Sequence, residues 1–89
     1  MKRLFRHRAT HEFWKLHEKL PAKIAALANV NFELLKSDPK HPSLHFKNIK
    51  EDIWSVRVGL RYRALAVEAG DDLVWFWIGS HADYDAMMR

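Results

Sequence analysis

IWSVRVGLRYRALAV occupies residues 53–67, and LVWFWIGSHADYD follows at residues 73–85 after a turn at 68–72. Apolar and polar side chains alternate through most of the first stretch, a pattern typical of strands with one buried face. Gly59 interrupts the alternation and predicts a hairpin turn. Residues 73–78 are apolar on both faces, as in a central strand or one that a partner covers. The two stretches therefore predict three successive strands of a small sheet.

The alternation also predicts how the first two strands pair. A three-residue turn at 59–61 places Arg57 opposite Arg63, so that both arginines share one face, whereas a two-residue turn would separate them. The other face carries small alanines that let helices approach closely, and we assign it to the helices. Its members are Trp54, Val56, Val58, Tyr62, Ala64 and Ala66. The faces of Trp75 and Trp77 stay open, because the turn before them fits more than one register.

The N-terminal half predicts two helices joined by a short break. Thr10 can cap a first helix that runs to about Lys19. Pro21 ends this helix and suits the first turn of a second, which stops before Pro39. Buried side chains are expected in the first helix at Phe13, Trp14 and Leu20, and in the second at Ile24, Leu27, Ala28, Asn31, Leu34 and Leu35.

Residues 40–52 predict a loop with a short edge strand near 44–47. The helices and strands together predict an α+β fold, in which an N-terminal helical hairpin packs on a small, mainly antiparallel twisted sheet. At 89 residues the chain has the length of one domain, and we expect this domain to span residues 1–89.

Composition excludes several classes of protein. The chain has no cysteine, which excludes disulfides and thiolate metal sites. No apolar run approaches the roughly 20 residues of a membrane span, and the first residues do not resemble a signal peptide. Histidines four residues apart, His7 with His11 and His41 with His45, have no third ligand nearby. We therefore expect a soluble cytoplasmic protein without a metal or other cofactor.

The net charge of +4 is unevenly distributed along the chain. Residues 1–9 carry four cations, residues 40–63 carry six against two acids, and residues after 63 are net acidic. A segregated basic patch suits nucleic acid or an acidic protein segment. A solvated basic surface explains the same charges equally well.

Residues at the end of the third strand suggest chemistry. His81 and Tyr84 follow Gly79 in a predicted loop, where they would lie beside Arg57 and Arg63. Two cations, an imidazole and a phenol suit a phosphate-bearing ligand and proton transfer. The alternatives are that His81 is only a turn residue, that Tyr84 only packs, and that the arginines form surface ion pairs with Glu68 or Asp85.

From about Ala9 to Tyr84, the order helix, Leu-Pro, helix, WSVRVGLRYRALAV and LVWFWIGSHADYD resembles the RelE/ParE superfamily of bacterial toxin–antitoxin toxins. GSHADYD is similar to the Gly-Ser/Thr-His stretch of the YafQ-like branch. The resemblance implies a metal-independent, ribosome-associated mRNA endoribonuclease with a cognate antitoxin, and an oligomer formed with that antitoxin.

The resemblance also implies roles for single residues. Arg57 and Arg63 match the positions that bind the scissile phosphate, His81 matches the histidine that takes part in cleavage, and Tyr84 falls near a C-terminal tyrosine of the family. Around these we expect Lys47, Lys50 and Arg61 to hold the RNA backbone, with His45 as a second proton carrier.

The sequence departs from the family pattern in three places. Ser55 stands where many relatives have a basic residue, the turn at 59–61 is one residue longer than usual, and the expected first strand in residues 1–8 has few apolar residues. Two other functions stay open, a ParE-like inhibitor of DNA gyrase and a catalytically inactive binding module. GSHADYD favours the nuclease, because a gyrase inhibitor needs no imidazole beside a phosphate site.

Overall fold

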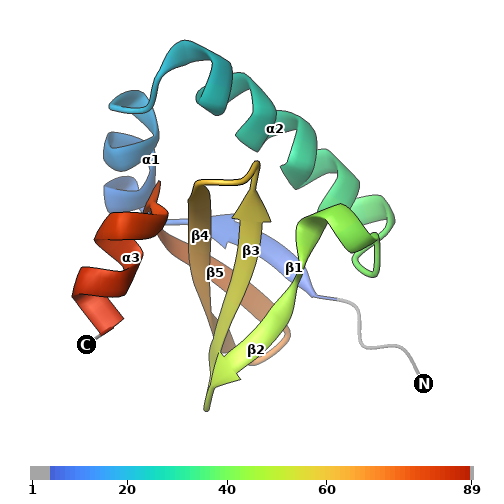
Figure 1. Cartoon of the computed structure of the whole chain (residues 1–89). Coiled ribbons are helices and arrows are strands. Elements are labelled where there is room, and N and C mark those ends of the chain that lie inside the picture. Colours follow the sequence, from blue (N-terminus) through green and yellow to red (C-terminus); the bar gives the residue numbers. More distant parts are fainter. Residues whose placement is uncertain (1–4, 89) are drawn as a thin grey trace.

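A five-stranded sheet, covered by two helices on one face, forms the centre of the computed structural model, which describes residues 5–88. The strand order is β1-β5-β4-β3-β2, with β1 parallel to β5 and the other neighbours antiparallel. Figure 1 shows α1 and α2 arching over the sheet and α3 leaving the end of β5. The elements are β1 (Arg6–Ala9), α1 (His11–Glu18), α2 (Ala22–Ser37), the 3-10 turn η1 (Pro42–Leu44), β2 (Lys47–Lys50), β3 (Ile53–Val58), β4 (Tyr62–Ala69), β5 (Asp72–Ser80) and α3 (His81–Met88). The expected α+β fold is confirmed.

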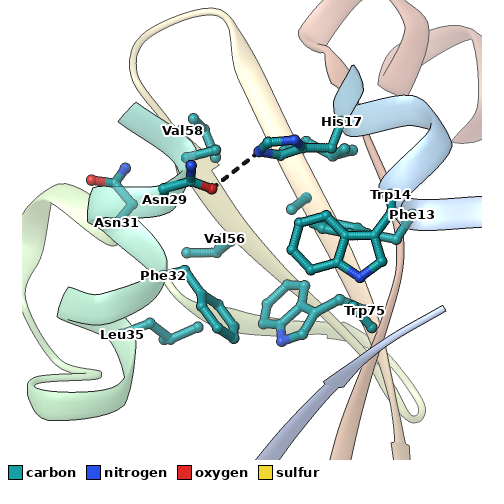
Figure 2. A pocket seen from close by; sticks show the side chains of 14 residues that line it. Phe13, Trp14, His17, Asn29, Asn31, Phe32, Leu35, Val56, Val58 and Trp75 are labelled. Carbon is teal, nitrogen blue, oxygen red and sulfur yellow. Dashed lines mark hydrogen bonds between the residues drawn. The ribbon is translucent and has the colours of Figure 1, made fainter. Parts of the chain in front are cut away.

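The two N-terminal helices begin and end where the sequence predicts. Thr10 Oγ1 accepts a hydrogen bond from the Phe13 amide at 3.1 Å, which satisfies one of the free N–H groups at the start of α1. The expected burial of Trp14 is wrong, because its side chain is 48% exposed. The short helix α1 packs against β5 and leaves Trp14 at the rim of an open cleft beside α2 (Figure 2).

The core lies between the helices and the sheet. Ala28 and Leu35 of α2 are buried, and small Ala64 and Ala66 in the sheet let α2 and α1 approach, as predicted. The other buried members are Leu44, Val56, Val58, Leu73, Trp75 and Ile78. Each fully buried aliphatic or aromatic side chain contributes roughly 1.5 to 3 kcal/mol to stability.

The edge strand does not lie where the sequence predicted it. Residues 42–44 form a 3-10 turn, and β2 begins only at Lys47. Pro42 favours the start of this turn, and His45, at a left-handed φ of 44°, ends it. The turn places Leu44 in the core with no exposed surface, which a strand at the sheet edge would not do.

A bulge in β5 determines the faces of the two tryptophans. Trp75 pairs with Ala66 and Trp77 with Leu65, which leaves Phe76 as the extra residue on β5. Trp75 therefore faces the helices and is 2% exposed, whereas Trp77 lies on the opposite face. An ideal Cβ on Gly79 would lie 2.7 Å from the Trp77 ring, so glycine is needed for the indole to lie against the strand.

The first strand expected in residues 1–8 is present as β1 in its described part, and residues 1–4 lie outside the described residues. Arg6 and Arg8 point outward, and their guanidinium groups lie 2.8 and 3.5 Å from the carboxylate of Asp72 on β5. These contacts hold the parallel edge of the sheet together.

Candidate functional site

Arg57 and Arg63 are opposite neighbours on β3 and β4, on the sheet face away from α1 and α2, which we call the arginine face. The predicted three-residue turn is thus confirmed. Like charges directly opposite one another destabilise a strand pair. Among residues 5–88 neither guanidinium has a carboxylate within ion-pair distance. The pair therefore presents uncompensated positive charge to an anion.

The two acids proposed as surface partners of the arginines have other contacts. Glu68 Oε1 accepts a hydrogen bond from Trp54 Nε1 at 2.5 Å, near the far end of β4. Asp85 Oδ2 lies 3.1 Å from His81 Nδ1. The alternative explanation of Arg57 and Arg63 as surface ion pairs with these acids is therefore not seen in the structure.

Arg63 is held on two sides. Its Nη1 donates to Ser55 Oγ at 2.9 Å, and its guanidinium carbon lies 5.1 Å from the centre of the Tyr84 ring. Stacking of a guanidinium on an aromatic ring contributes about 0.5 to 2 kcal/mol. The Nε atom of Arg63 is buried and has no hydrogen-bond partner among residues 5–88. A buried donor without an acceptor is costly, and this one lies in the centre of the candidate site.

Arg57 has a histidine at its other side. Arg57 Nη1 lies 3.4 Å from Nε2 of His45, the residue that follows η1. Because a guanidinium can only donate, Nε2 of His45 is the acceptor in this contact. The Arg57 carbonyl accepts from Asn31 Nδ2 at 3.2 Å, which ties β3 to α2. The structure thus brings the second proton carrier expected from the sequence to the arginine pair.

His81 begins the helix α3, so the prediction that it lies in a loop is wrong. The Ser80 hydroxyl accepts a hydrogen bond from the Asp83 amide at 3.1 Å. The Asp83 carboxylate, in the first turn, interacts favourably with the helix dipole. The helical turn places Asp85 four residues on, 3.1 Å from His81 Nδ1. This contact orients the imidazole through Nδ1 and leaves Nε2 for another partner. The His81 side chain is 45% exposed.

Tyr84 connects the histidine to the arginines. Its ring centre lies 5.9 Å from that of His81 and 6.4 Å from that of Trp77, and the same ring covers Arg63. The His81 amide also donates to the Arg61 carbonyl at 2.6 Å, which fixes the start of α3 against the β3–β4 turn. His81, Tyr84 and Arg63 therefore form one continuous cluster.

Two of the three outer cations expected to bind RNA lie on the same face of the sheet as this cluster, and their role stays a prediction. Lys47 pairs with Ser55 and Lys50 with Ile53, so the register places both lysines on the arginine face. Arg61 is exposed in the β3–β4 turn.

Sequence reasoning missed four supporting residues: Ser55, Trp77, Gly79 and Asp85. The spacing of Asp85 from His81 would have indicated the pair if residues 81–88 had been recognised as a helix. A serine among apolar strand residues was the corresponding signal for Ser55.

The cleft between α1 and α2 lies on the other side of the sheet. Its walls are mostly apolar, and at its mouth His17 Nε2 and Asn29 Oδ1 lie 3.1 Å apart and join the two helices (Figure 2). Because the sheet separates this cleft from Arg57 and Arg63, it takes no part in the candidate site.

The sequence model of the ParE-like toxin domain matches residues 23–86, which span most of both layers of the fold and the whole arginine face. The chain belongs to the ParE-like toxin family. This confirms the resemblance at the level of the RelE/ParE superfamily, whereas the YafQ-like branch stays a prediction. No curated protein sequence matches the chain. No helix within residues 5–88 is long and apolar enough to span a membrane.

Solved structures share the fold of this toxin domain at low sequence identity. The toxin–antitoxin complex RelB-RelE from Methanococcus jannaschii matches at 18% identity and a TM-score of 0.73, over 92% of this chain and 99% of that one. YafQ from E. coli matches at 10% identity and a TM-score of 0.72, over 90% and 97%. The YoeB/ParE toxin from Agrobacterium tumefaciens matches at 18% identity and a TM-score of 0.64, over 86% and 99%.

Proposed function

We propose that this ParE-like domain, spanning residues 1–89, is the toxin of a bacterial toxin–antitoxin module and cleaves mRNA on the ribosome. The observation that carries the proposal is the pair Arg57 and Arg63, without carboxylate partners among the described residues, beside the His81–Asp85 pair. Cations at the phosphate and an oriented imidazole suit the cleavage of RNA by its own 2′-hydroxyl, which needs no metal. The GSHADYD segment, similar to that of the YafQ-like branch, supports the same chemistry.

The reaction is attack of a ribose 2′-oxygen on the adjacent phosphorus. The 2′-O–P bond forms, the P–O5′ bond breaks, and the products are a 2′,3′-cyclic phosphate and a 5′-hydroxyl. One group removes the proton of the 2′-hydroxyl and another donates a proton to the departing 5′-oxygen. Arg57 and Arg63 bind the phosphate and stabilise the negative charge of the phosphorane between these steps.

The positions of the two histidines suit these two proton transfers. In-line attack puts the attacking and departing oxygens on opposite sides of the phosphorus. His45 contacts Arg57 on the β2 side of the arginine pair, and His81 reaches Arg63 through Tyr84 on the α3 side. His81 carries the orienting carboxylate and is the principal acid–base group, with His45 as its counterpart. Tyr84 positions Arg63 and offers a surface for a base to stack on.

The partners follow from the charge of the same face. Lys47, Lys50 and Arg61 bind the RNA backbone around the cleavage site. The same cations suit an acidic segment of a cognate antitoxin, with which the toxin forms an oligomer; complexes of this kind are among the structures that share the fold. Ribosomes and mRNA place the activity in the cytoplasm.

Replacement of His81 tests the chemistry. We expect His81→Ala to slow mRNA cleavage by about 100-fold or more, while binding to ribosomes survives through the cations. His81→Gln keeps hydrogen bonding but cannot transfer the proton, and should be almost as slow. The matched control is His11→Ala, because His11 is exposed at the start of α1 on the other side of the molecule. The measurement is mapping of mRNA 5′ ends in a purified translation system with intact ribosomes. The cleavage step itself should need no metal ion.

The alternative is inhibition of DNA gyrase without cleavage, which the match to a ParE-like toxin domain leaves open. Plasmid supercoiling after induction of the toxin distinguishes the two functions. Full growth arrest by His81→Ala, with intact mRNA and altered supercoiling, would reject the nuclease in favour of gyrase inhibition. Growth that continues with intact mRNA and normal supercoiling on induction of the natural sequence would indicate an inactive binding module.

A further inference from the structure

Ser55 is a polar residue in an unusual place for a strand. It lies in the middle of β3 with 0% of its surface exposed, opposite Leu65 on β4 and Lys47 on β2. Burial of a hydroxyl among apolar side chains is unfavourable unless the group makes a hydrogen bond. The bond it makes is with Arg63, whose Nη1 donates to Ser55 Oγ at 2.9 Å.

The contact fixes Arg63 without neutralising it. A carboxylate at position 55 would hold the guanidinium equally well but would cancel the charge that attracts a phosphate. A lysine or arginine there would repel it. The serine hydroxyl is an uncharged acceptor, so it sets the position of the guanidinium and leaves the positive charge intact.

The opposite side of Arg63 is also closed. Tyr84 covers the guanidinium, Trp77 lies behind Tyr84, and the buried Nε of Arg63 has no acceptor. Side chains as long as arginine lose up to about 2 kcal/mol of rotamer freedom when they are ordered. The contacts with Ser55 and Tyr84 restrict this freedom before any ligand binds, which favours stabilisation of a transition state with little further reorganisation.

We propose that Ser55 is a positioning residue, which holds the Arg63 guanidinium in the orientation that receives the scissile phosphate. The proposal rests on the proposed nuclease function for its substrate. The part of the proposal in which the uncharged Ser55 hydroxyl fixes the Arg63 guanidinium does not depend on the reaction.

The first test is kinetic. We expect Ser55→Ala to lower kcat by about 10- to 100-fold, because misplacement of a binding group by about 1 Å has effects of this size, with KM changed by less than about 3-fold. Ser55→Cys keeps the volume but is a weak acceptor, and should be similarly slow. Ser55→Thr keeps the hydroxyl and should restore most of the activity. The control is Ser37→Ala, because the Ser37 hydroxyl bonds only to carbonyls of its own helix.

The second test does not depend on cleavage. In the full chain labelled with ¹⁵N-arginine, the Arg63 Nε–H signal should exchange slowly with water, because that atom is buried. Ser55→Ala and Ser55→Cys should speed this exchange at a temperature at which both variants stay folded, and Ser55→Thr should not. If the natural sequence fails to cleave RNA, the nuclease proposal falls and this measurement alone decides the role of Ser55. Unchanged exchange in Ser55→Ala and Ser55→Cys, or cleavage by both at the natural rate, would overturn the proposal.

Discussion

Arg63 carries two unfavourable features at once in the folded protein. Arg57 lies directly opposite it with the same charge, and its Nε–H is buried without an acceptor. The repulsion between the two guanidinium groups is offset when an anion binds between them. The presence of an arginine at this position is better explained by ligand binding than by its effect on folding. Selection for stability alone would favour an uncharged side chain here.

Replacement of Arg63 should therefore separate stability from activity. Arg63→Ala removes a like-charge contact and an unsatisfied donor but also loses the stacking on Tyr84 and the bond to the buried Ser55 hydroxyl, so we expect the free energy of unfolding to change by no more than about 1 to 2 kcal/mol. Cleavage and growth arrest should be abolished. Arg63→Lys keeps the charge but not the planar fork, and should recover little of the activity. Urea denaturation and the 5′-end mapping measure the two effects; an unfolded Arg63→Ala would show that Arg63 is structural.

At the scale of elements, β5 and α3 act together as the support of the site. Gly79 lets the Trp77 indole lie along β5, Trp77 backs Tyr84, and Tyr84 covers Arg63. The position of the Arg63 guanidinium thus depends on Gly79 through two aromatic side chains. No residue of α3 is fully buried, so its position depends on these few contacts.

We expect Gly79→Ala to disturb the site through this series of contacts. The new methyl group would lie 2.7 Å from the Trp77 ring, so the indole must move and Tyr84 with it. Overpacking of this kind costs about 1 to 3 kcal/mol, and cleavage should fall by more than the loss of folded protein explains. Gly70→Ala is the control, because a Cβ there meets no atom within 4 Å and only the φ of 62° is strained. It should lose stability but keep the activity of the folded fraction; equal activity per folded molecule in both variants would contradict the support role.

The elements also show what a sequence can and cannot predict. The register of Arg57 and Arg63 followed from alternation and turn length, because a shift by one residue would expose Val56 and Val58. The bulge at Phe76 could not be predicted, because a strand that is apolar on both faces does not indicate where an extra residue lies. The helix at 81–88 was missed because its stability comes from a serine cap and the packing of Tyr84 rather than from an apolar repeat.

The cations and the histidine of the candidate site could be named from the sequence, whereas the residues that support them could not. Charged and titratable residues are visible in a sequence by type alone. Ser55 and Trp77 matter only through which side chain they touch, and that depends on pairings that the structure supplies. The contact between His45 and Arg57 likewise depends on the left-handed turn after Leu44.

At the scale of the whole molecule, His7 links the first strand to the core beneath α2. Its Nδ1 accepts a hydrogen bond from Trp75 Nε1 at 3.1 Å, and its ring meets that of Phe32 edge to face. Burial lowers the pKa of His7 below its usual value of 6.5, and the nearby positive charge of Lys36 lowers it further. The neutral imidazole is therefore part of the native packing.

This lowered pKa predicts a loss of stability in mild acid. Below about pH 6.5 the unfolded chain takes up a proton on His7 that the folded protein does not. The free energy of unfolding therefore decreases as the pH is lowered from about 6.5 to the pKa of His7 in the folded protein. His7→Asn keeps an acceptor near the position of Nδ1 but does not titrate. Urea denaturation at pH 7.5 and 5.5 should show a smaller loss of stability for His7→Asn than for the natural sequence. Equal losses in the two proteins would mean that His7 does not link folding to pH.

The parallel pairing of β1 with β5 has a consequence for when the protein can fold. Arg6 and Asp72, which meet across this pair, are 66 residues apart in the chain. Pairing over such separations is slow, and it must wait until β5 has been synthesised and has left the ribosome. The residues that β4, β5 and α3 contribute to the arginine face are synthesised late as well. A nascent chain therefore carries both N-terminal helices outside the ribosome before the arginine face can form, and any activity of the proposed site can begin only after α3 has emerged.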